Sequence, residues 1–115
     1  MTHPVMWFEV LGADGDKLRK FYGDLFGWTY KEAKEMNYGM TDPEATGIGG
    51  GIGAAMMGGA GWTTFYVGVS DIDKALADAT KRGAKVLTPV TKLPDVTFAV
   101  FADPEGHPVG LLLQP

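Results

Sequence analysis

Residues 103–113, DPEGHPVGLLL, repeat the plan of residues 42–52, DPEATGIGGGI, which lie 61 positions earlier in the chain. Both segments open with Asp-Pro-Glu, pass through a short turn and carry glycine at the eighth position, Gly110 and Gly49. One spacing of 61 in a chain of 115 residues indicates two similar halves rather than a longer repeat array.

The composition predicts a globular domain, since 45% of the residues are hydrophobic and 21% are charged. A net charge of −4 without a cluster of Lys and Arg argues against a nucleic-acid partner. The lack of cysteine excludes disulfides, thiolate metal sites and thiol nucleophiles. No apolar run approaches the ~18 residues of a membrane span, and the first ten residues lack signal-peptide features. We therefore expect a cytoplasmic protein with no membrane partner.

The first half predicts a strand, a helix and three further strands. Residues 4–11 form an apolar run of strand-favouring residues that places Val5, Trp7 and Glu9 on one face. An apolar stripe that ends at Phe26 predicts a helix, which Asp14 or Asp16 would cap and Gly27 would end. The remaining strands are predicted at residues 28–34, 38–41 and 47–55.

The second half predicts the same order of elements. Residues 63–69 alternate as a strand, with Tyr66 on one face. Ser70 or Asp71 would cap the following helix, which ends at Gly83. The last three strands are predicted at residues 84–87, 96–101 and 109–113, and residues 56–61, MMGGAG, form a flexible linker between the halves.

Three segments carry a resemblance to a known family: FYGDLFGW at 21–28, YVGVSDIDKALADATKRGAKV at 66–86 and FADPEGHPVGLLL at 101–113. They resemble the vicinal oxygen chelate superfamily, which includes glyoxalase I, bleomycin-resistance proteins and extradiol dioxygenases. The aromatic-rich start of the chain is similar to a bacterial branch of short or duplicated members. The resemblance implies an α+β fold in which two βαβββ modules form a curved mixed sheet around a cleft, with the helices on the outside. One glyoxalase/bleomycin-resistance-like domain would span residues 1–115, with modules at about 4–55 and 62–114 and the linker at 56–61.

The resemblance also implies a divalent metal ion, held by His, Gln or Glu on the first and fourth strands of each module. Such a site needs three or four ligands that converge on one ion. The matching positions in this sequence are Val5, Gly49, Thr64 and Gly110. None of them offers a conventional side-chain ligand, and a shift of one residue along any strand brings no better one. The sequence therefore predicts no metal and no cofactor.

Three ionisable side chains remain as candidates for a site, and His3 and His107 are the only imidazoles that another metal site could use. Glu9 could hold a cationic or hydroxylated ligand, or it could be an edge carboxylate bonded to backbone. His107 could be a solvated turn residue, or it could line the rim of the cleft and titrate near neutral pH. His3 lies in a terminus that we expect to be frayed. Glu9 and His107 are thus the catalytic candidates.

Aromatic and apolar residues dominate the predicted inner face, which is how proteins bind flat or apolar small molecules. The same residues could instead form core, but glycines among them indicate that something approaches the backbone closely. The predicted ligand-binding residues are Trp7, Glu9, Trp62, Tyr66, Phe101 (or Val100) and Leu112, with Tyr38 or Met40 beside them.

Three functions are compatible with these residues. The first is a metal-independent protein that binds a hydrophobic or aromatic small molecule, as drug-sequestering, bleomycin-resistance-like members do. The second is a lyase, isomerase or dioxygenase-like enzyme that uses Glu9 as a base, assisted by Tyr66 or His107, or an unrecognised metal site. The third is a structural role in an oligomer. The missing ligands favour the first function. Because relatives are often dimers, a homodimer is also expected, with the modules paired within one chain or between two.

Overall fold

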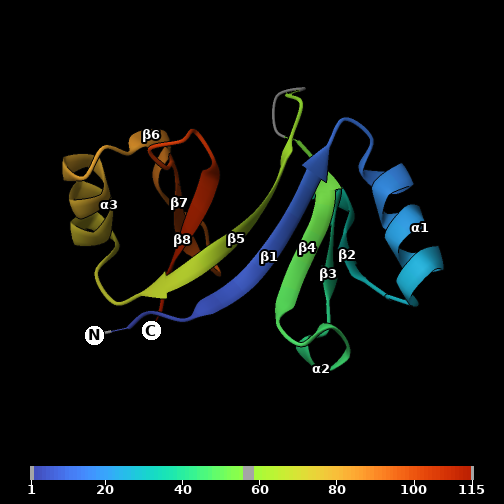
Figure 1. Ribbon diagram of the computed structural model, residues 1–115. Helices are drawn as coiled ribbons and strands as arrows, with labels where there is room; N and C mark the ends of the chain where they lie inside the picture. The colour runs from blue at the N-terminus through green and yellow to red at the C-terminus, as the bar shows by residue number, and fades with distance from the viewer. Residues whose placement is uncertain (1, 56–58, 115) are drawn as a thin grey trace. The chain divides into compact units, whose positions relative to one another are not determined.

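Two units of similar plan make up the protein in the computed structural model, which describes residues 2–55 and 59–114. The first unit comprises Trp7–Thr63, and the second comprises Met1–Met6 together with Thr64–Pro115. The predicted linker at 56–61 includes residues 56–58, which lie outside the described residues. Figure 1 labels the helices and strands of both units.

The first unit orders its strands β2-β3-β4-β1. Strand β1 pairs with β4 in parallel, whereas β3 pairs with both β4 and β2 in antiparallel fashion. The elements are β1 (Val5–Gly12, shared with the second unit), α1 (Gly15–Phe26), β2 (Lys31–Ala33), the 3-10 helix η1 (Lys34–Met36), β3 (Tyr38–Thr41), α2 (Pro43–Thr46) and β4 (Gly49–Ala54).

The second unit orders its strands β5-β8-β7-β6 and repeats the same pairing, with β5 and β8 parallel and the other pairs antiparallel. Its elements are β5 (Trp62–Val69, of which Trp62 and Thr63 belong to the first unit), α3 (Ile72–Lys81), β6 (Lys85–Lys92), β7 (Thr97–Ala102) and β8 (Pro108–Leu113). Both halves therefore run strand, helix and three strands in chain order. The predicted α+β class with mixed strand pairing is confirmed.

The ends of the two long helices follow from local sequence. Asp14 caps α1 by accepting a hydrogen bond from the Lys17 backbone N–H, and Asp71 caps α3 through Lys74 in the same way. Gly27 ends α1 in the left-handed conformation at φ 74°, which costs glycine least. Of the alternative caps predicted, the structure thus selects Asp14 and Asp71.

Each helix covers one face of its own strands. In the first unit the fully buried Ile52 of β4 lies on the face toward α1, where the Arg19 guanidinium reaches its carbonyl oxygen. In the second unit Ile72 of α3 packs with Val69, Ala99 and Leu111, which are all buried. The opposite face of each set of strands is left for a site.

Candidate functional site

Strand register assigns the residues of the first unit to two faces. A Cβ atom on Gly39 would lie 2.7 Å from Cδ of Arg19, so Gly39 and its partner Ile52 face α1. Neighbouring positions alternate, which places Tyr38 and Met40 on the other face. We call this surface the inner face.

The inner face also carries Trp7 and Glu9 of β1, because these residues pair with Gly49 and Gly51 of β4. Gly51 is in turn the partner of Met40. The predicted faces of Trp7 and Glu9 are thus confirmed. The sequence left open whether Tyr38 or Met40 lies here, and the register places both on this face.

Aromatic rings cover the glycines of the inner face. A Cβ atom on Gly49 would come within 2.8 Å of the Trp7 ring, and one on Gly51 would overlap the Tyr38 hydroxyl. The glycines were expected to leave room for something that approaches the backbone. In the first unit that close neighbour is the protein's own aromatic side chains, so the space over the glycines is filled.

A chain of hydrogen bonds joins these side chains. The Tyr38 hydroxyl donates to Oε2 of Glu9 at 2.9 Å, and Nε1 of Trp62 donates to Oε1 of Glu9 at 3.0 Å. Nε1 of Trp7 donates to the Tyr38 oxygen at 3.0 Å. Glu9 is buried at 9% exposure, and its carboxylate is held by side chains from β3 and β5 rather than by backbone alone. The main effect of this chain is to orient three aromatic rings.

Burial determines the protonation of Tyr38. Removal from water raises the pKa of its phenol far above the ordinary value, and the nearby Glu9 charge raises it further. The hydroxyl therefore stays protonated at neutral pH and donates to Glu9. The indole N–H of Trp7 can only donate, so the Tyr38 oxygen accepts that hydrogen bond.

A groove of about 510 Å³ opens beside Trp7 within the first unit. Its volume falls within the roughly 300–1,000 Å³ typical of ligand sites. We call it the Trp7 groove, and it is lined by Trp7, Thr29, Tyr30, Lys31, Met40, Thr41 and Asp42. The sequence predicted Trp7 and suggested Met40, but it missed the five others. The Asp-Pro pair at 42–43 was the one local signal, and it was interpreted as a turn.

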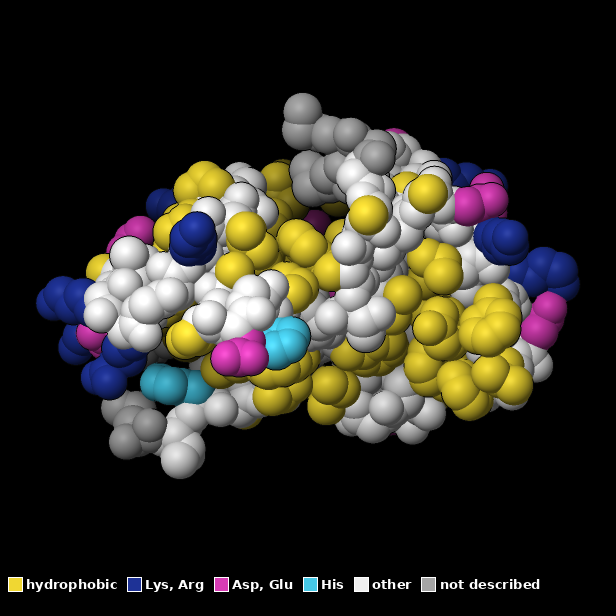
Figure 2. Space-filling model, turned by 45° about the horizontal axis from the view of Figure 1, so that its top comes forward, with side chains coloured by type: hydrophobic (Ala, Val, Ile, Leu, Met, Phe, Trp, Pro, Cys, Tyr) yellow, Lys and Arg dark blue, Asp and Glu magenta, His cyan; other side chains and the backbone are white. Residues whose placement is uncertain are grey.

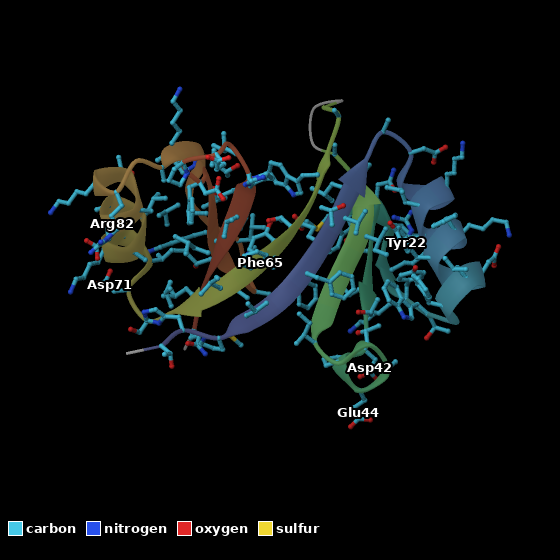
Figure 3. All side chains as sticks on the ribbon, in the orientation of Figure 1. Tyr22, Asp42, Glu44, Phe65, Asp71 and Arg82 are labelled. Carbon is cyan, nitrogen blue, oxygen red and sulfur yellow. The ribbon has the colours of Figure 1, made fainter. Side chains whose placement is uncertain are left out.

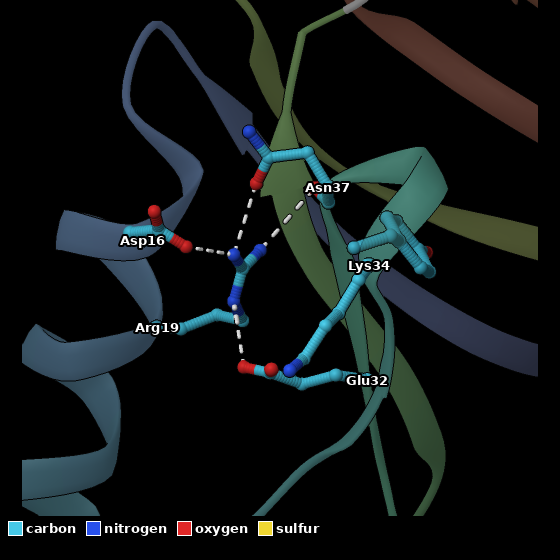
Figure 4. Close-up of a pocket in the computed structure, with 6 residues that line it drawn as sticks. Asp16, Arg19, Glu32, Lys34 and Asn37 are labelled. Carbon is cyan, nitrogen blue, oxygen red and sulfur yellow. Dashed lines mark hydrogen bonds and ion pairs between the residues drawn. The ribbon is translucent and has the colours of Figure 1, made fainter.

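A second hollow, of about 300 Å³, lies around Arg19 (Figure 4). The buried guanidinium donates through Nη1 to the backbone oxygens of Asn37 and Ile52, and through Nη2 to the Asn37 side chain. Asp16 binds Nη2 at 2.5 Å, and Glu32 lies 3.6 Å from Nε. Every nitrogen of Arg19 already has a protein partner. Arg19 therefore has a structural role, since it joins α1 to the strands, and the hollow around it is not a ligand site.

The predicted site residues of the second unit divide between its two faces. Tyr66 pairs with Gly110 and its ring covers that glycine, as Trp7 covers Gly49. Leu112, the partner of Gly68, shares the face of Tyr66. Phe101 lies on the other face, packed against the core beneath α3, whereas Val100 pairs with Gly110. The prediction for Phe101 is corrected, since its alternative Val100 takes the Tyr66 face.

His107 lies in the turn before β8, where its side chain is 71% exposed. Its backbone N–H donates to Asp103 at 2.9 Å, and its Nδ1 lies 3.1 Å from the same carboxylate. That backbone hydrogen bond, together with the imidazole, holds the pKa of Asp103 below its ordinary value. The structure thus shows His107 as a turn residue of the second unit, whereas Glu9 belongs to the first.

The four positions that would hold a metal do not fit one. Val5 is exposed, and the buried Thr64 donates its hydroxyl to the Pro108 carbonyl. At Gly49 and Gly110 the space that a ligand side chain would need is occupied by aromatic rings. Within residues 2–55 and 59–114, no three His, Asp or Glu side chains lie close enough to hold an ion. The donor set therefore does not suit the divalent ion that the fold implies.

Two mixed-sheet units of βαβββ plan define a protein of the glyoxalase class. Residues 8–112 match the glyoxalase-like domain family, so the chain belongs to that family. This confirms the predicted place in the vicinal oxygen chelate superfamily. Among the described helices, none is long and apolar enough to cross a membrane.

Solved structures with the same fold are similar over almost the full length of the chain. A glyoxalase/bleomycin resistance protein/dioxygenase superfamily member from Vibrio splendidus has 16% identity and a TM-score of 0.66, with 98% of this chain and 100% of that chain covered. A structure of an NAD-dependent benzaldehyde dehydrogenase from Legionella pneumophila has 16% identity and a TM-score of 0.68, with 95% of this chain and 98% of that chain covered. Methylmalonyl-CoA epimerase from Mycobacterium tuberculosis has 12% identity and a TM-score of 0.64, with 96% of this chain and 87% of that chain covered. At these identities the likeness concerns the fold alone. No curated protein matches the chain.

Proposed function

We propose that this protein is a metal-independent small-molecule-binding member of the family, comparable to its drug-sequestering, bleomycin-resistance-like members. One observation carries the proposal. The Trp7 indole, held by Tyr38, forms a wall of the 510 Å³ groove. A ring that is already fixed in position loses little side-chain entropy when a ligand packs against it. The groove is thus prepared for a flat or apolar molecule.

The lining of the groove supports a hydrophobic or aromatic ligand. Trp7, Tyr30 and Met40 supply apolar and polarisable surface, and a few polar groups lie among them. In this arrangement Glu9 acts through Tyr38, since it positions the indole and is not itself among the lining residues. Glu9 is therefore a positioning residue for the groove.

The donor positions support metal independence. A valine, a threonine and two glycines stand where the ligands would be, and rings fill the space at both glycines. Addition of Zn²⁺, Ni²⁺ or Mn²⁺ should leave the melting temperature unchanged, and EDTA should not alter ligand binding. Metal analysis that found one tightly held equivalent per chain would contradict this part of the proposal.

The binding function is tested by a thermal-shift screen of aromatic compounds and glycopeptides. A ligand at 100 times its dissociation constant should raise the free energy of unfolding by about 2.7 kcal/mol. Trp7→Leu should abolish that shift, whereas Phe21→Leu, at an exposed aromatic of α1 outside the groove, should leave it intact. A panel with no stabilising compound, or stabilisation that survives Trp7→Leu, would overturn the proposal.

A second candidate function is an enzyme that removes a proton by acid–base chemistry. It is favoured by one observation: the buried Glu9 carboxylate accepts a hydrogen bond from a phenol, that of Tyr38. Because the fold is shared with methylmalonyl-CoA epimerases, methylmalonyl-CoA in D₂O is a suitable first probe. Exchange of its α proton, lost in Glu9→Gln, would support this function. No exchange with any carbonyl compound that binds would rule it out.

A further inference from the structure

Two opposite charges lie on the inner face at the Trp7 groove. Lys31 pairs directly with Met40 in the β2–β3 ladder, so their side chains share a face. Asp42 is two residues beyond Met40 and keeps an extended backbone at φ −82°, ψ 126°, which directs its side chain to the same face. Lys31, Met40 and Asp42 all line the groove.

Neither charge is neutralised within the described part of the chain. Lys31 is exposed and forms no ion pair within 4.0 Å among residues 2–55 and 59–114. Asp42 uses Oδ1 to accept from the Glu44 backbone N–H at 2.9 Å, at the start of α2 (Figure 3). Its second oxygen has no partner among the described residues, and no ion pair joins it to Lys31.

The two charges also have a suitable separation. Asp42 lies directly after the end of β3, and the position diagonal to Lys31 in a continued antiparallel pair would be roughly 7–8 Å away. At that spacing the flexible side chains of Lys31 and Asp42 can bind a carboxylate and an ammonium that are attached to the same carbon atom of a ligand. The Trp7 indole and Met40 would then contact an apolar ring attached to the same ligand.

We propose that the Trp7 groove binds a small aromatic zwitterion, that is, an amino acid with an aromatic side chain. Lys31 pairs with the α-carboxylate, Asp42 with the α-ammonium, and the ring packs on Trp7. This inference rests on the proposed binding function and specifies its ligand class. A neutral aromatic compound would leave both protein charges without a partner. A ligand with a single charge would meet one partner and repel the other.

Four probes separate the contributions of ring and charges. They are L-phenylalanine, phenethylamine (without the carboxylate), 3-phenylpropionate (without the ammonium) and 3-phenyl-1-propanol (neutral). None absorbs at the wavelengths that excite tryptophan selectively, so quenching of protein fluorescence reports binding directly. Shifts of the indole ¹⁵N–¹H signal of Trp7, assigned through Trp7→Phe, locate the bound molecule. We expect L-phenylalanine to bind about fivefold more tightly than either singly charged analogue, the upper end for exposed ion pairs.

Variants of the two charges provide the matched test. Asp42→Asn removes the charge and keeps a good helix cap, and Lys31→Gln lies at an exposed strand position. Asp42→Asn should weaken L-phenylalanine binding about fivefold and leave 3-phenylpropionate binding unweakened. Lys31→Gln should also weaken L-phenylalanine binding about fivefold, but it should leave phenethylamine binding unweakened. Lys34→Gln, which lines the Arg19 hollow, is the control and should change nothing.

The outcomes distinguish this inference from the function on which it rests. If 3-phenyl-1-propanol binds at Trp7 as tightly as L-phenylalanine, the groove is a site for aromatics and the zwitterion inference is wrong. If only phenethylamine binds, Asp42 alone selects ligands and the inference is again overturned. If no probe shifts the Trp7 signal but another compound in the thermal-shift panel does, the binding function stands without this ligand class. If nothing at all binds, both proposals are wrong.

Discussion

Tyr38 connects the protonation of one residue to the stability of the first unit. Its folded-state pKa is raised by burial and then by Glu9, whereas in the unfolded chain it titrates near its usual value of about 10. A raised folded pKa means that the stabilisation is fully present below the unfolded value and is lost as pH rises above it. We therefore expect the free energy of unfolding to fall above about pH 10.

Tyr38→Phe tests this linkage. At pH 7 the change should cost about 1–3 kcal/mol, because Trp7 loses its acceptor and Glu9 loses one donor. Above about pH 10 the free energy of unfolding should fall less steeply in Tyr38→Phe than in the parent protein. Part of the fall should remain, because burial also raises the pKa of Tyr30. Urea unfolding between pH 7 and 11 provides the measurement. Tyr22→Phe is the control, and an unchanged slope in Tyr38→Phe would contradict the prediction.

Gly110 and Gly68 test whether ring contact explains the repeat glycines. A Cβ atom on Gly110 would overlap the Tyr66 ring, which is itself buried at 5% exposure. A Cβ atom on Gly68, on the same face, would meet the flexible ends of Met6 and Gln114. Gly110→Ala should therefore destabilise by about 1–3 kcal/mol, and Gly68→Ala by clearly less. Equal midpoints in urea would show that the Tyr66 ring moves aside without cost.

At the scale of elements, Arg19 attaches α1 to the strands. Its guanidinium binds the carbonyls of Asn37 and Ile52 from the helix, and its burial leaves only 7% exposed. Arg19→Lys keeps the charge but has no planar fork to reach both carbonyls. We expect a loss of about 2–3 kcal/mol, measured by urea unfolding, because buried carbonyls lose their donor. Lys20→Ala, in the solvent-exposed pair with Asp24, should change stability little. An Arg19→Lys protein as stable as the parent would contradict this role.

The strengths and limits of sequence-based prediction are visible in particular elements. Helix α1, strand β3 and the inner-face positions of Trp7 and Glu9 were predicted, because periodicity and caps are local signals. Strand β2 is shorter than predicted because the Trp28 ring packs against Tyr22 and Phe26 of α1. The short helix α2 was missed although Asp42 caps it.

Strand β6 extends through Pro89 to Lys92, well beyond its predicted end at Leu87. Proline argues against a central strand, yet β6 pairs only with β7 and carries irregularities around Thr88. For the site, the hydrogen bond between Glu9 and Trp62 joins residues 53 positions apart, and no local pattern encodes such a contact. The lining of the groove depends on the same kind of long-range pairing.

At the scale of the whole molecule, the predicted homodimer remains a prediction. Helix α1 exposes Phe21, Leu25 and Phe26 by 56–59%. The Phe21 ring adjoins that of Tyr22, and the Phe26 ring adjoins that of Trp28. Hydrophobic side chains gather on the side of α1 in Figure 2. A contiguous apolar patch of this kind marks a surface for protein contact.

A second copy of the chain is the partner that this patch would suit. The charges at its edge, Lys20 and Asp24, are opposite and four residues apart on one helix. In a two-fold arrangement of antiparallel α1 helices, Lys20 of each copy can meet Asp24 of the other, because such an interface is self-complementary. Light scattering should then give twice 12.3 kDa at high concentration. Phe21→Lys should shift the protein to monomer, whereas Val86→Lys, at an exposed position of β6, should not. A monomeric parent protein would rule out the dimer, and a dimer that survives Phe21→Lys would place its interface on another surface.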